Sequence, residues 1–146
     1  EKAATMGVEL CSLPELFSRA QVISNHLANN EQTKGMLNYA LFSNMRPYAV
    51  FINTGRGAQV VEADLVRALE EEPGRTAVLD VTWPEPVEAD HAFYRLPNVI
   101  LTPHIAGSQE MEVARMGSYM AEAFENFSSG ISCPHEVTEA MLKTMA

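Results

Sequence analysis

The sequence has no apolar run that approaches the ~20 residues of a membrane-spanning helix, so we expect no membrane partner. Cysteine is scarce, because Cys11 and Cys133 are the only two, which is too few for a disulfide framework. Neither the cysteines nor the four histidines have the spacing of metal ligands, and we expect no metal. The lack of a disulfide pattern favours a reducing cytoplasm in which both thiols are free.

Basic residues are also few. The chain has 10 Lys and Arg against 19 Asp and Glu, a net charge of -9, and a surface of this sign disfavours nucleic acid as a main partner. The first residues, Glu1 to Ala4, resemble neither a signal peptide nor a transit peptide. At 146 residues the chain is long enough for one domain with its own core.

Strand-like and helix-like segments alternate along the chain, and this pattern predicts an α/β fold with a parallel sheet. Strands are expected at 21–27, 49–53, 77–81 and 99–101, with a weak candidate at Val8 to Leu10. Helices are expected at 13–17, 38–45, 61–71, 109–128 and 138–145. Ser12 is a suitable N-cap for the first helix, and Ser108 is one for the long helix, which Gly130 would end as its C′ residue.

A doubly wound nucleotide-binding sheet opens with a strand and a Gly-x-Gly-x-x-Gly turn, and the sequence contains neither. The segment Gly55-Arg56-Gly57 cannot replace this turn, because the arginine would crowd a pyrophosphate. We therefore interpret residues 1–130 as the second half of a Rossmann unit and residues 131–146 as a C-terminal helical tail. In that arrangement the strand at 21–27 would lie at an open edge of the sheet, where another chain could pair with it.

Three predicted strands end in polar loops that carry Arg56, Glu85 and His104. The carboxyl ends of the strands line the ligand crevice of an open parallel sheet. We therefore expect a cation, a carboxylate and an imidazole to converge on one site.

Each of these residues, taken alone, has a more ordinary interpretation. Arg56 fits either an exposed tight turn or a clamp for a substrate carboxylate, which the planar guanidinium matches with two hydrogen bonds. A lone histidine such as His104 is more often a core or capping residue, and Glu85 alone could be a solvated loop acid. Pairing of Glu85 with His104 favours a catalytic site, because a carboxylate fixes the tautomer of an imidazole and tunes it for proton exchange near neutral pH.

Two further polar side chains lie at the ends of predicted strands. Asp80 ends an apolar strand, where a charge requires a partner; that partner is either a cap or turn hydrogen bond or an amide of a bound cofactor. His26 would face the same crevice as a cofactor contact. His91 and His135 lie in polar segments and receive no role.

Together these residues resemble the D-isomer-specific 2-hydroxyacid dehydrogenases, which include phosphoglycerate, glyoxylate and hydroxypyruvate reductases. The resemblance spans essentially the whole chain, and several motifs in one order make it more specific than any short motif. The motifs are Asn-Thr-Gly-Arg-Gly at 53–57, Leu-Asp-Val at 79–81, Pro-Glu-Pro at 84–86 and the segment 96–107.

The resemblance implies hydride transfer between NAD or NADP and a small 2-hydroxy or 2-oxo acid. Arg56 would hold the substrate carboxylate, His104 would exchange a proton with the C2 oxygen, and Glu85 would pair with His104. Asp80 would meet the nicotinamide side of the cofactor. The further cofactor contacts implied are His26, Ala28, Thr54, Gly55, Ala106 and Gly107.

The resemblance also implies a homodimer, and a substrate domain and glycine-rich turn that precede residue 1. The sequence departs from the family in one loop. Many members have the pattern His-x-Pro there, whereas this chain has His26-Leu27-Ala28. The alternative function is a non-catalytic fragment that folds and associates without turnover. A hydrolase that uses Glu85 and His104 is a distant third possibility, because the sequence has no Gly-x-Ser-x-Gly motif.

Overall fold

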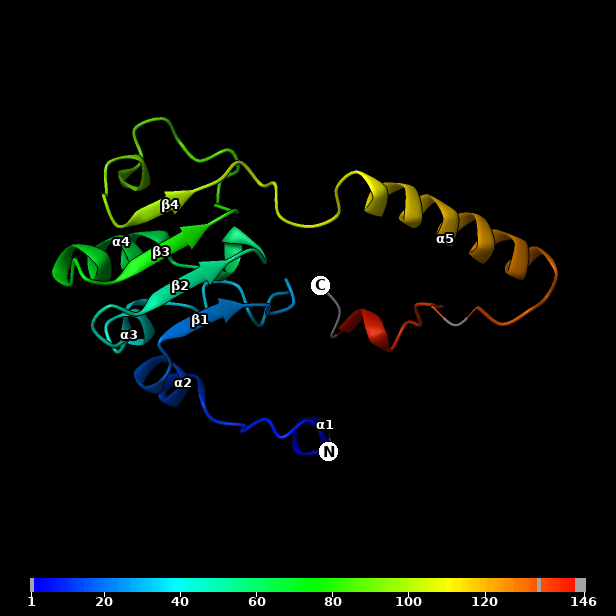
Figure 1. Ribbon diagram of the computed structural model, residues 1–146, viewed down its shortest axis with the longest axis horizontal. Helices are drawn as coiled ribbons and strands as arrows, with labels where there is room; N and C mark the ends of the chain where they lie inside the picture. Colours follow the sequence, from blue (N-terminus) through cyan, green and yellow to red (C-terminus); the bar gives the residue numbers. More distant parts are fainter. Residues whose placement is uncertain (1, 134, 144–146) are drawn as a thin grey trace. The chain divides into compact units, whose positions relative to one another are not determined.

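The computed structural model describes residues 2–133 and 135–143, and its first feature is a four-stranded parallel sheet. The strand order is β1-β2-β3-β4, and each strand pairs with the next along the chain (Figure 1). The strands are β1 (Val22–Asn25), β2 (Val50–Asn53), β3 (Thr76–Leu79) and β4 (Val99–Leu101). The predicted α/β fold with a parallel sheet is confirmed, and β1 lies at one edge of the described sheet as expected.

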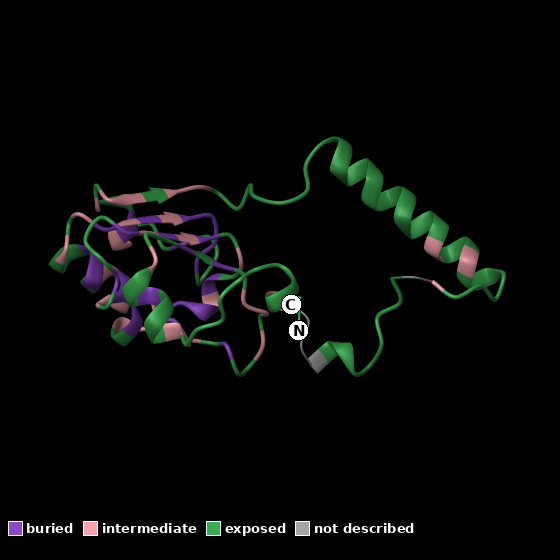
Figure 2. Cartoon of the chain, turned by 60° about the horizontal axis from the view of Figure 1, so that its bottom comes forward, coloured by how far each residue is buried: buried purple, intermediate pink, exposed green. Residues whose placement is uncertain are grey.

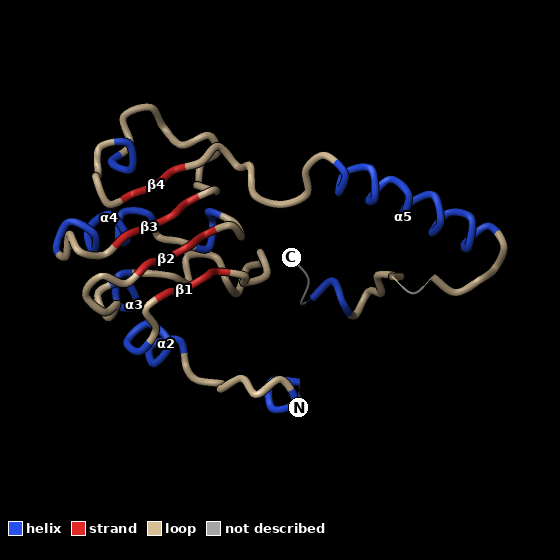
Figure 3. The backbone as a smooth tube through the Cα atoms, in the orientation of Figure 1, coloured by secondary structure: helices blue, strands red, loops and turns tan. Residues whose placement is uncertain are grey.

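Helices alternate with these strands (Figure 3). The α-helices are α1 (Lys2–Thr5), α2 (Leu13–Arg19), α3 (Tyr39–Phe42), α4 (Glu62–Glu71) and α5 (Met111–Ser128). Three short 3₁₀ helices are η1 (Gly57–Gln59), η2 (Ala92–Tyr94) and η3 (Met141–Lys143). Within the described parts of the chain, none of the helices is long and apolar enough to cross a membrane.

The chain divides into two compact units, Glu1–His104 and Ile105–Ala146. The first unit contains the sheet and its helices, and the second contains α5 and η3. The predicted boundary after residue 130, which separates a Rossmann part from a tail, stays a prediction.

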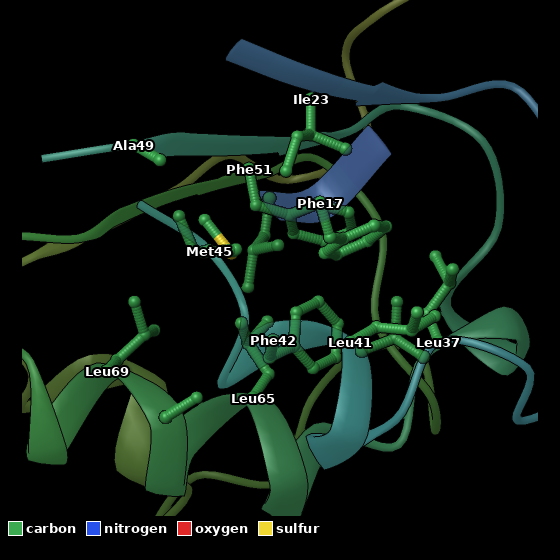
Figure 4. Close-up of a cluster of buried hydrophobic side chains, with 14 of the residues drawn as sticks. Phe17, Ile23, Leu37, Leu41, Phe42, Met45, Ala49, Phe51, Leu65 and Leu69 are labelled. Carbon is green, nitrogen blue, oxygen red and sulfur yellow. The ribbon is translucent and has the colours of Figure 1, made fainter. Parts of the chain in front are cut away.

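The core of the first unit lies between the sheet and α2, α3 and α4. Every second residue of β1, β2 and β3 is buried, including Ile23 and Phe51. Phe51 packs against Phe42 of α3 and Phe17 of α2, with ring centroids 5.1 Å and 6.3 Å away (Figure 4). Each fully buried phenylalanine contributes about 1.5–3 kcal/mol. Figure 2 shows this buried layer, and the alternate residues on the other face of the sheet are half-buried or exposed.

Local sequence signals explain two helix ends. Ser12 caps α2 in a capping box, in which the Glu15 amide donates to the serine hydroxyl and the glutamate accepts from the Ser12 amide. At the end of α5, Gly130 adopts a φ of 67°, and the Ile131 amide donates to the Asn126 carbonyl at 2.9 Å. This is the Schellman geometry that glycine favours, so both predicted caps are confirmed.

The strands expected at 21–27 and 77–81 and the helix expected at 38–45 are present but shorter, as Val22–Asn25, Thr76–Leu79 and Tyr39–Phe42. Three other local predictions fail. Val8 to Leu10 form no strand; the Val8 amide instead donates to the Ala3 carbonyl at 2.9 Å, and none of the described strands pairs with this segment. Ser108 does not cap α5, which begins at Met111 with Glu110 in the cap position and no side-chain cap bond. Of the helix expected at 138–145, only the 3₁₀ turn η3 is present in the described part, and residues 144 and 145 lie outside the described residues.

Gly57 makes the closest approach between two loops of the sheet edge. A Cβ atom at this position would lie 2.1 Å from the carbonyl carbon and oxygen of Thr82. Only a glycine lets the loop after β2 rest against the backbone that follows β3.

We expect Gly57→Ala to lower the free energy of unfolding by about 1–3 kcal/mol, because the two loops must separate to admit a methyl group. Urea unfolding measures the change. Gly117→Ala is the matched control, since nothing lies within 4 Å of that position in α5 and alanine is favoured in helices. A Gly57→Ala variant as stable as the wild type would contradict the close contact.

Candidate active site

The carboxyl ends of β3 and β4 border a cavity of about 390 Å³, a size that suits a small ligand or part of a larger one. Its walls combine apolar side chains with a few polar groups. The lining residues, all in the first unit, are Asp80, Thr82, Glu85, Pro86, Val87, Tyr94, Leu101, Thr102, Pro103 and His104.

A carboxylate and an imidazole meet in this cavity. The Nδ1 atom of His104 lies 2.5 Å from Oε1 of Glu85, and the two side chains are 42% and 38% exposed. An ionised carboxylate can only accept hydrogen bonds, so Nδ1 carries the proton and donates it. The Nε2 atom of the same ring is then the nitrogen that remains for a ligand.

The backbone at His104 is strained. Its φ of 52° lies in the left-handed region, which non-glycine residues adopt at a cost of about 1–3 kcal/mol. Strain of this kind is concentrated at functional sites. Glycine would adopt this conformation without strain but has no side chain. Histidine at this position provides the imidazole that contacts Glu85.

Asp80 connects the ends of three strands. Its backbone amide donates to the Asn53 carbonyl of β2 at 2.9 Å. Its side chain, which is buried, accepts a hydrogen bond of 2.5 Å from the Thr102 hydroxyl just after β4. The predicted need for a partner is therefore met within the protein, and the carboxylate still lines the cavity.

A buried network of three amide side chains supports the neighbouring loops. Asn25 at the end of β1 donates to Asn53 at the end of β2 at 3.0 Å, and to Gln59 of η1 at 2.5 Å. All three are at most 4% exposed. Sequence analysis gave Asn25 and Gln59 no role; the available signal was an amide that ends an apolar strand, where only internal hydrogen bonds can satisfy it.

This amide network positions two loops that carry predicted cofactor contacts. Gln59 donates to the carbonyl groups of Leu27 and Ala28 at 2.6 and 3.0 Å. Asn53 accepts from the Gly55 amide at 3.0 Å and donates to the Arg56 carbonyl at 3.2 Å. Buried amide hydrogen bonds of this kind are costly to leave unmade, so the network fixes the backbone of both loops.

The remaining predicted site residues lie outside the cavity lining. Arg56 is exposed, and its guanidinium donates to the Gly55 carbonyl at 2.7 Å. His26 pairs with the Ser24 hydroxyl at 2.8 Å and lines a second cavity of about 280 Å³ beside β1. Thr54 is exposed on the loop that follows β2. Ala106 and Gly107 belong to the second unit, and Gly107 has a φ of 113°.

Glu62, in the first turn of α4, is a further ionisable group near the cavity. Its side chain is 11% exposed and accepts from the Trp83 amide at 2.7 Å, while Nε2 of His91 lies 3.5 Å away. Burial raises the pKa of Glu62, and the Trp83 amide and the His91 charge oppose this with smaller effects. Sequence analysis singled out neither Glu62 nor His91. Across residues 2–133 and 135–143, no three His, Cys, Asp or Glu side chains gather as metal ligands.

Comparison with known proteins points to one family. The sequence profile of the D-isomer specific 2-hydroxyacid dehydrogenase NAD-binding domain matches residues 1–106. A glyoxylate/hydroxypyruvate reductase A from Serratia proteamaculans is 46% identical over 86 residues, which cover 59% of this chain and 28% of that protein.

Two solved structures are also similar. An NADPH-dependent glyoxylate/hydroxypyruvate reductase from Sinorhizobium meliloti, in complex with NADP and sulfate, has 32% identity and a TM-score of 0.76 over 88% of this chain and 42% of that one. A D-lactate dehydrogenase with NAD⁺ from Lactobacillus jensenii has 26% identity and a TM-score of 0.75 over 88% of this chain and 43% of that one. The chain spans only 25% to 41% of the length of the curated relatives that it matches.

The pKa of Glu62 gives a pH dependence with a defined sign. A carboxyl whose pKa is raised from 4.5 by folding stabilises the fold fully below that value and loses its contribution as the pH rises through the folded pKa. Glutamine does not titrate. We therefore expect the free energy of unfolding of the wild type to fall, relative to that of Glu62→Gln, as the pH rises from about 4 to 7.

Urea unfolding across this pH range measures the difference. Repeating it in a His91→Gln background removes the titration of the imidazole that faces Glu62. A stability difference that is constant with pH in that background would contradict the raised pKa.

Proposed function

Because the chain belongs to the D-isomer-specific 2-hydroxyacid dehydrogenase family, whose NAD-binding domain matches residues 1–106, we propose that it carries the catalytic residues of an NAD(P)-dependent oxidoreductase. Its substrates are small 2-hydroxy and 2-oxo acids of the glyoxylate and hydroxypyruvate class. The observation that carries this proposal is the 2.5 Å contact between Nδ1 of His104 and Oε1 of Glu85, in a cavity that Asp80 also lines.

His104 is the proton donor and acceptor in this proposal. With its Nδ1–H held by Glu85, the ring presents Nε2 to the C2 oxygen of the substrate. It donates a proton to that oxygen when a 2-oxo acid is reduced, and accepts one when a 2-hydroxy acid is oxidised. Glu85 holds the ring in one tautomer and balances the charge of the imidazolium.

The residues beside the cavity fit the nicotinamide end of the cofactor. Val87 and Leu101 supply apolar wall for a flat ring, and Asp80 supplies a carboxylate for its carboxamide. When bound, NAD or NADP supplies the hydride acceptor, and its reduced form supplies the donor. The backbone of Thr54 and Gly55 contacts the cofactor on one side.

Further contacts of the proposed cofactor come from His26, Ala28, Ala106 and Gly107. The amide network supports the first two, because Gln59 fixes the carbonyl groups of the loop to which they belong. This sequence contains no Gly-x-Gly-x-x-Gly turn for the pyrophosphate, and no residue is assigned to that group here.

Arg56 binds the substrate carboxylate in this proposal. Its guanidinium is exposed and can form two parallel hydrogen bonds with a carboxylate. Support comes from Gly57, whose close contact with Thr82 joins the arginine loop to a residue of the cavity wall.

We further propose that the protein acts as a cytoplasmic homodimer. The two free cysteines, Cys11 and Cys133, support the compartment. The open edge of β1 supports association of this chain on its own.

The native protein, at the length its gene encodes, tests this function. Fluorescence titration with NADH and NADPH identifies the cofactor, and a steady-state assay with glyoxylate, hydroxypyruvate and pyruvate identifies the substrate. Binding and turnover with one of these pairs is the expected result. Association without cofactor binding or turnover would favour the non-catalytic alternative.

We expect His104→Gln in the native protein to lower kcat by about 10²–10⁴-fold, because a positioned proton donor is lost. Cofactor affinity, measured by NADH or NADPH titration, changes much less. His135→Gln is the control, since this exposed histidine has no assigned role. A kcat close to the wild-type value would remove His104 from the mechanism.

Arg56→Lys tests the carboxylate clamp. A lysine keeps the charge but cannot reproduce the two parallel hydrogen bonds, so we expect KM for the acid to rise about tenfold or more. Arg115→Lys in α5 is the control, because that arginine pairs with Glu112 at 2.5 Å. Unchanged KM and kcat in Arg56→Lys would show that Arg56 does not hold the substrate.

A further inference from the structure

The loop that carries Glu85 is held near this residue by the 2.9 Å hydrogen bond from the Thr82 hydroxyl to the Pro84 carbonyl and by the buried side chain of Val87, but neither contact holds the carboxylate itself. The loop joins β3 to β4, and both neighbours of Glu85 are prolines, which have no backbone N–H to donate. The Glu85 side chain is 38% exposed, so packing does not fix it. The position of this carboxylate must therefore be set by attachments elsewhere in the loop.

Glu62 provides attachments on both sides of Glu85. Its Oε1 atom accepts from the Trp83 amide at 2.7 Å, two residues before Glu85. Its Oε2 atom lies 3.5 Å from Nε2 of His91, six residues after Glu85. The Phe93 amide donates to Nδ1 of His91 at 3.3 Å, so the ring proton is on Nε2, the nitrogen that lies 3.5 Å from Glu62.

The attachment is rigid because Glu62 stands on a helix and is 11% exposed. The preceding segment adds a third contact, in which Gly57 rests against the backbone of Thr82. One structural segment, from η1 to the first turn of α4, thus supports the loop at Thr82, Trp83 and His91.

We propose that Glu62 is a positioning residue, which fixes the loop between β3 and β4 so that the Glu85 carboxylate stays on Nδ1 of His104. Glu62 does not line the cavity, so it acts through Glu85. An effect of Glu62 on turnover rests on the proposed function, whereas its effect on the position of the Glu85 carboxylate does not.

Variants at Glu62 separate these consequences. Glu62→Ala removes both attachments. Glu62→Gln keeps an acceptor for the shorter of the two contacts, the 2.7 Å hydrogen bond from the Trp83 amide, so it should rescue the loop. Glu70→Ala is the matched control, because Glu70 is exposed on the same helix.

The first measurement needs neither cofactor nor substrate. NMR of histidine-labelled protein reports the solvent exchange of the His104 Nδ1–H. We expect exchange to be about tenfold faster in Glu62→Ala, because the hydrogen bond that holds this proton is weakened, and unchanged in Glu62→Gln and Glu70→Ala. Trp83, the single tryptophan, gives a matching fluorescence change in Glu62→Ala.

The second measurement is steady-state kinetics of the native protein. Glu62→Ala should lower kcat by up to about 10²-fold, as a small displacement of a catalytic group does, with KM for the acid and cofactor affinity within about twofold. Glu62→Gln should restore most of kcat. This division between kcat and KM distinguishes a positioning residue from a general loss of fold.

Each outcome decides the proposal. Unchanged Nδ1–H exchange in a folded Glu62→Ala would overturn it, and so would a Glu62→Gln variant as defective as alanine. If circular dichroism shows Glu62→Ala unfolded, Glu62→Asp replaces it, because the shorter side chain cannot reach both Trp83 and His91. Faster exchange in a native protein without turnover would support the positioning role and reject the proposed function.

Discussion

Parallel pairing of four short strands is the constraint on which the rest of the first unit depends. Because β1 to β4 run in one direction and pair in sequence order, the segment that follows each strand emerges at the same edge of the sheet. Residues as distant in sequence as Asn25 and His104 are thereby placed at one edge. The chemistry available to the protein is set by what those four segments carry.

Polar groups at this edge are satisfied by one another. Asn25, Asn53 and Gln59 bond among themselves and to the loop backbones, and Thr102 bonds to Asp80. A buried amide without a partner costs about 1–3 kcal/mol, so alternative arrangements of these loops are disfavoured. The loops therefore depend on buried side chains, although their own residues are largely exposed.

Sequence patterns were sufficient to predict the parts of the fold that depend on local chemistry. The four strands, the Ser12 capping box and the Gly130 helix end follow from apolar runs and cap residues. The contact of Glu85 with His104 could also be anticipated, since both follow strands of one parallel sheet. The absence of a strand at Val8 to Leu10 could not be anticipated in this way. A strand needs a neighbouring strand to pair with, and the periodicity of one segment does not reveal whether that neighbour is present.

The supports of the site were invisible in the sequence for a related reason. The attachment of Glu62 to Trp83 joins residues 21 positions apart, and the Gly57 contact involves only a missing Cβ. Neither leaves a local pattern. A glutamate near a helix start is common for its own reasons, so residue type alone does not reveal that it supports a loop.

These supports matter because the pair at the centre cannot hold itself. Glu85 and His104 are 38% and 42% exposed, and an exposed ion pair contributes only about 0–1 kcal/mol. That is too little to offset the strain of about 1–3 kcal/mol in a left-handed residue such as His104. The short Nδ1–Oε1 contact therefore depends on how the two loops are anchored, and the carboxylates that anchor them, Glu62 and Asp80, are much less exposed than the pair itself.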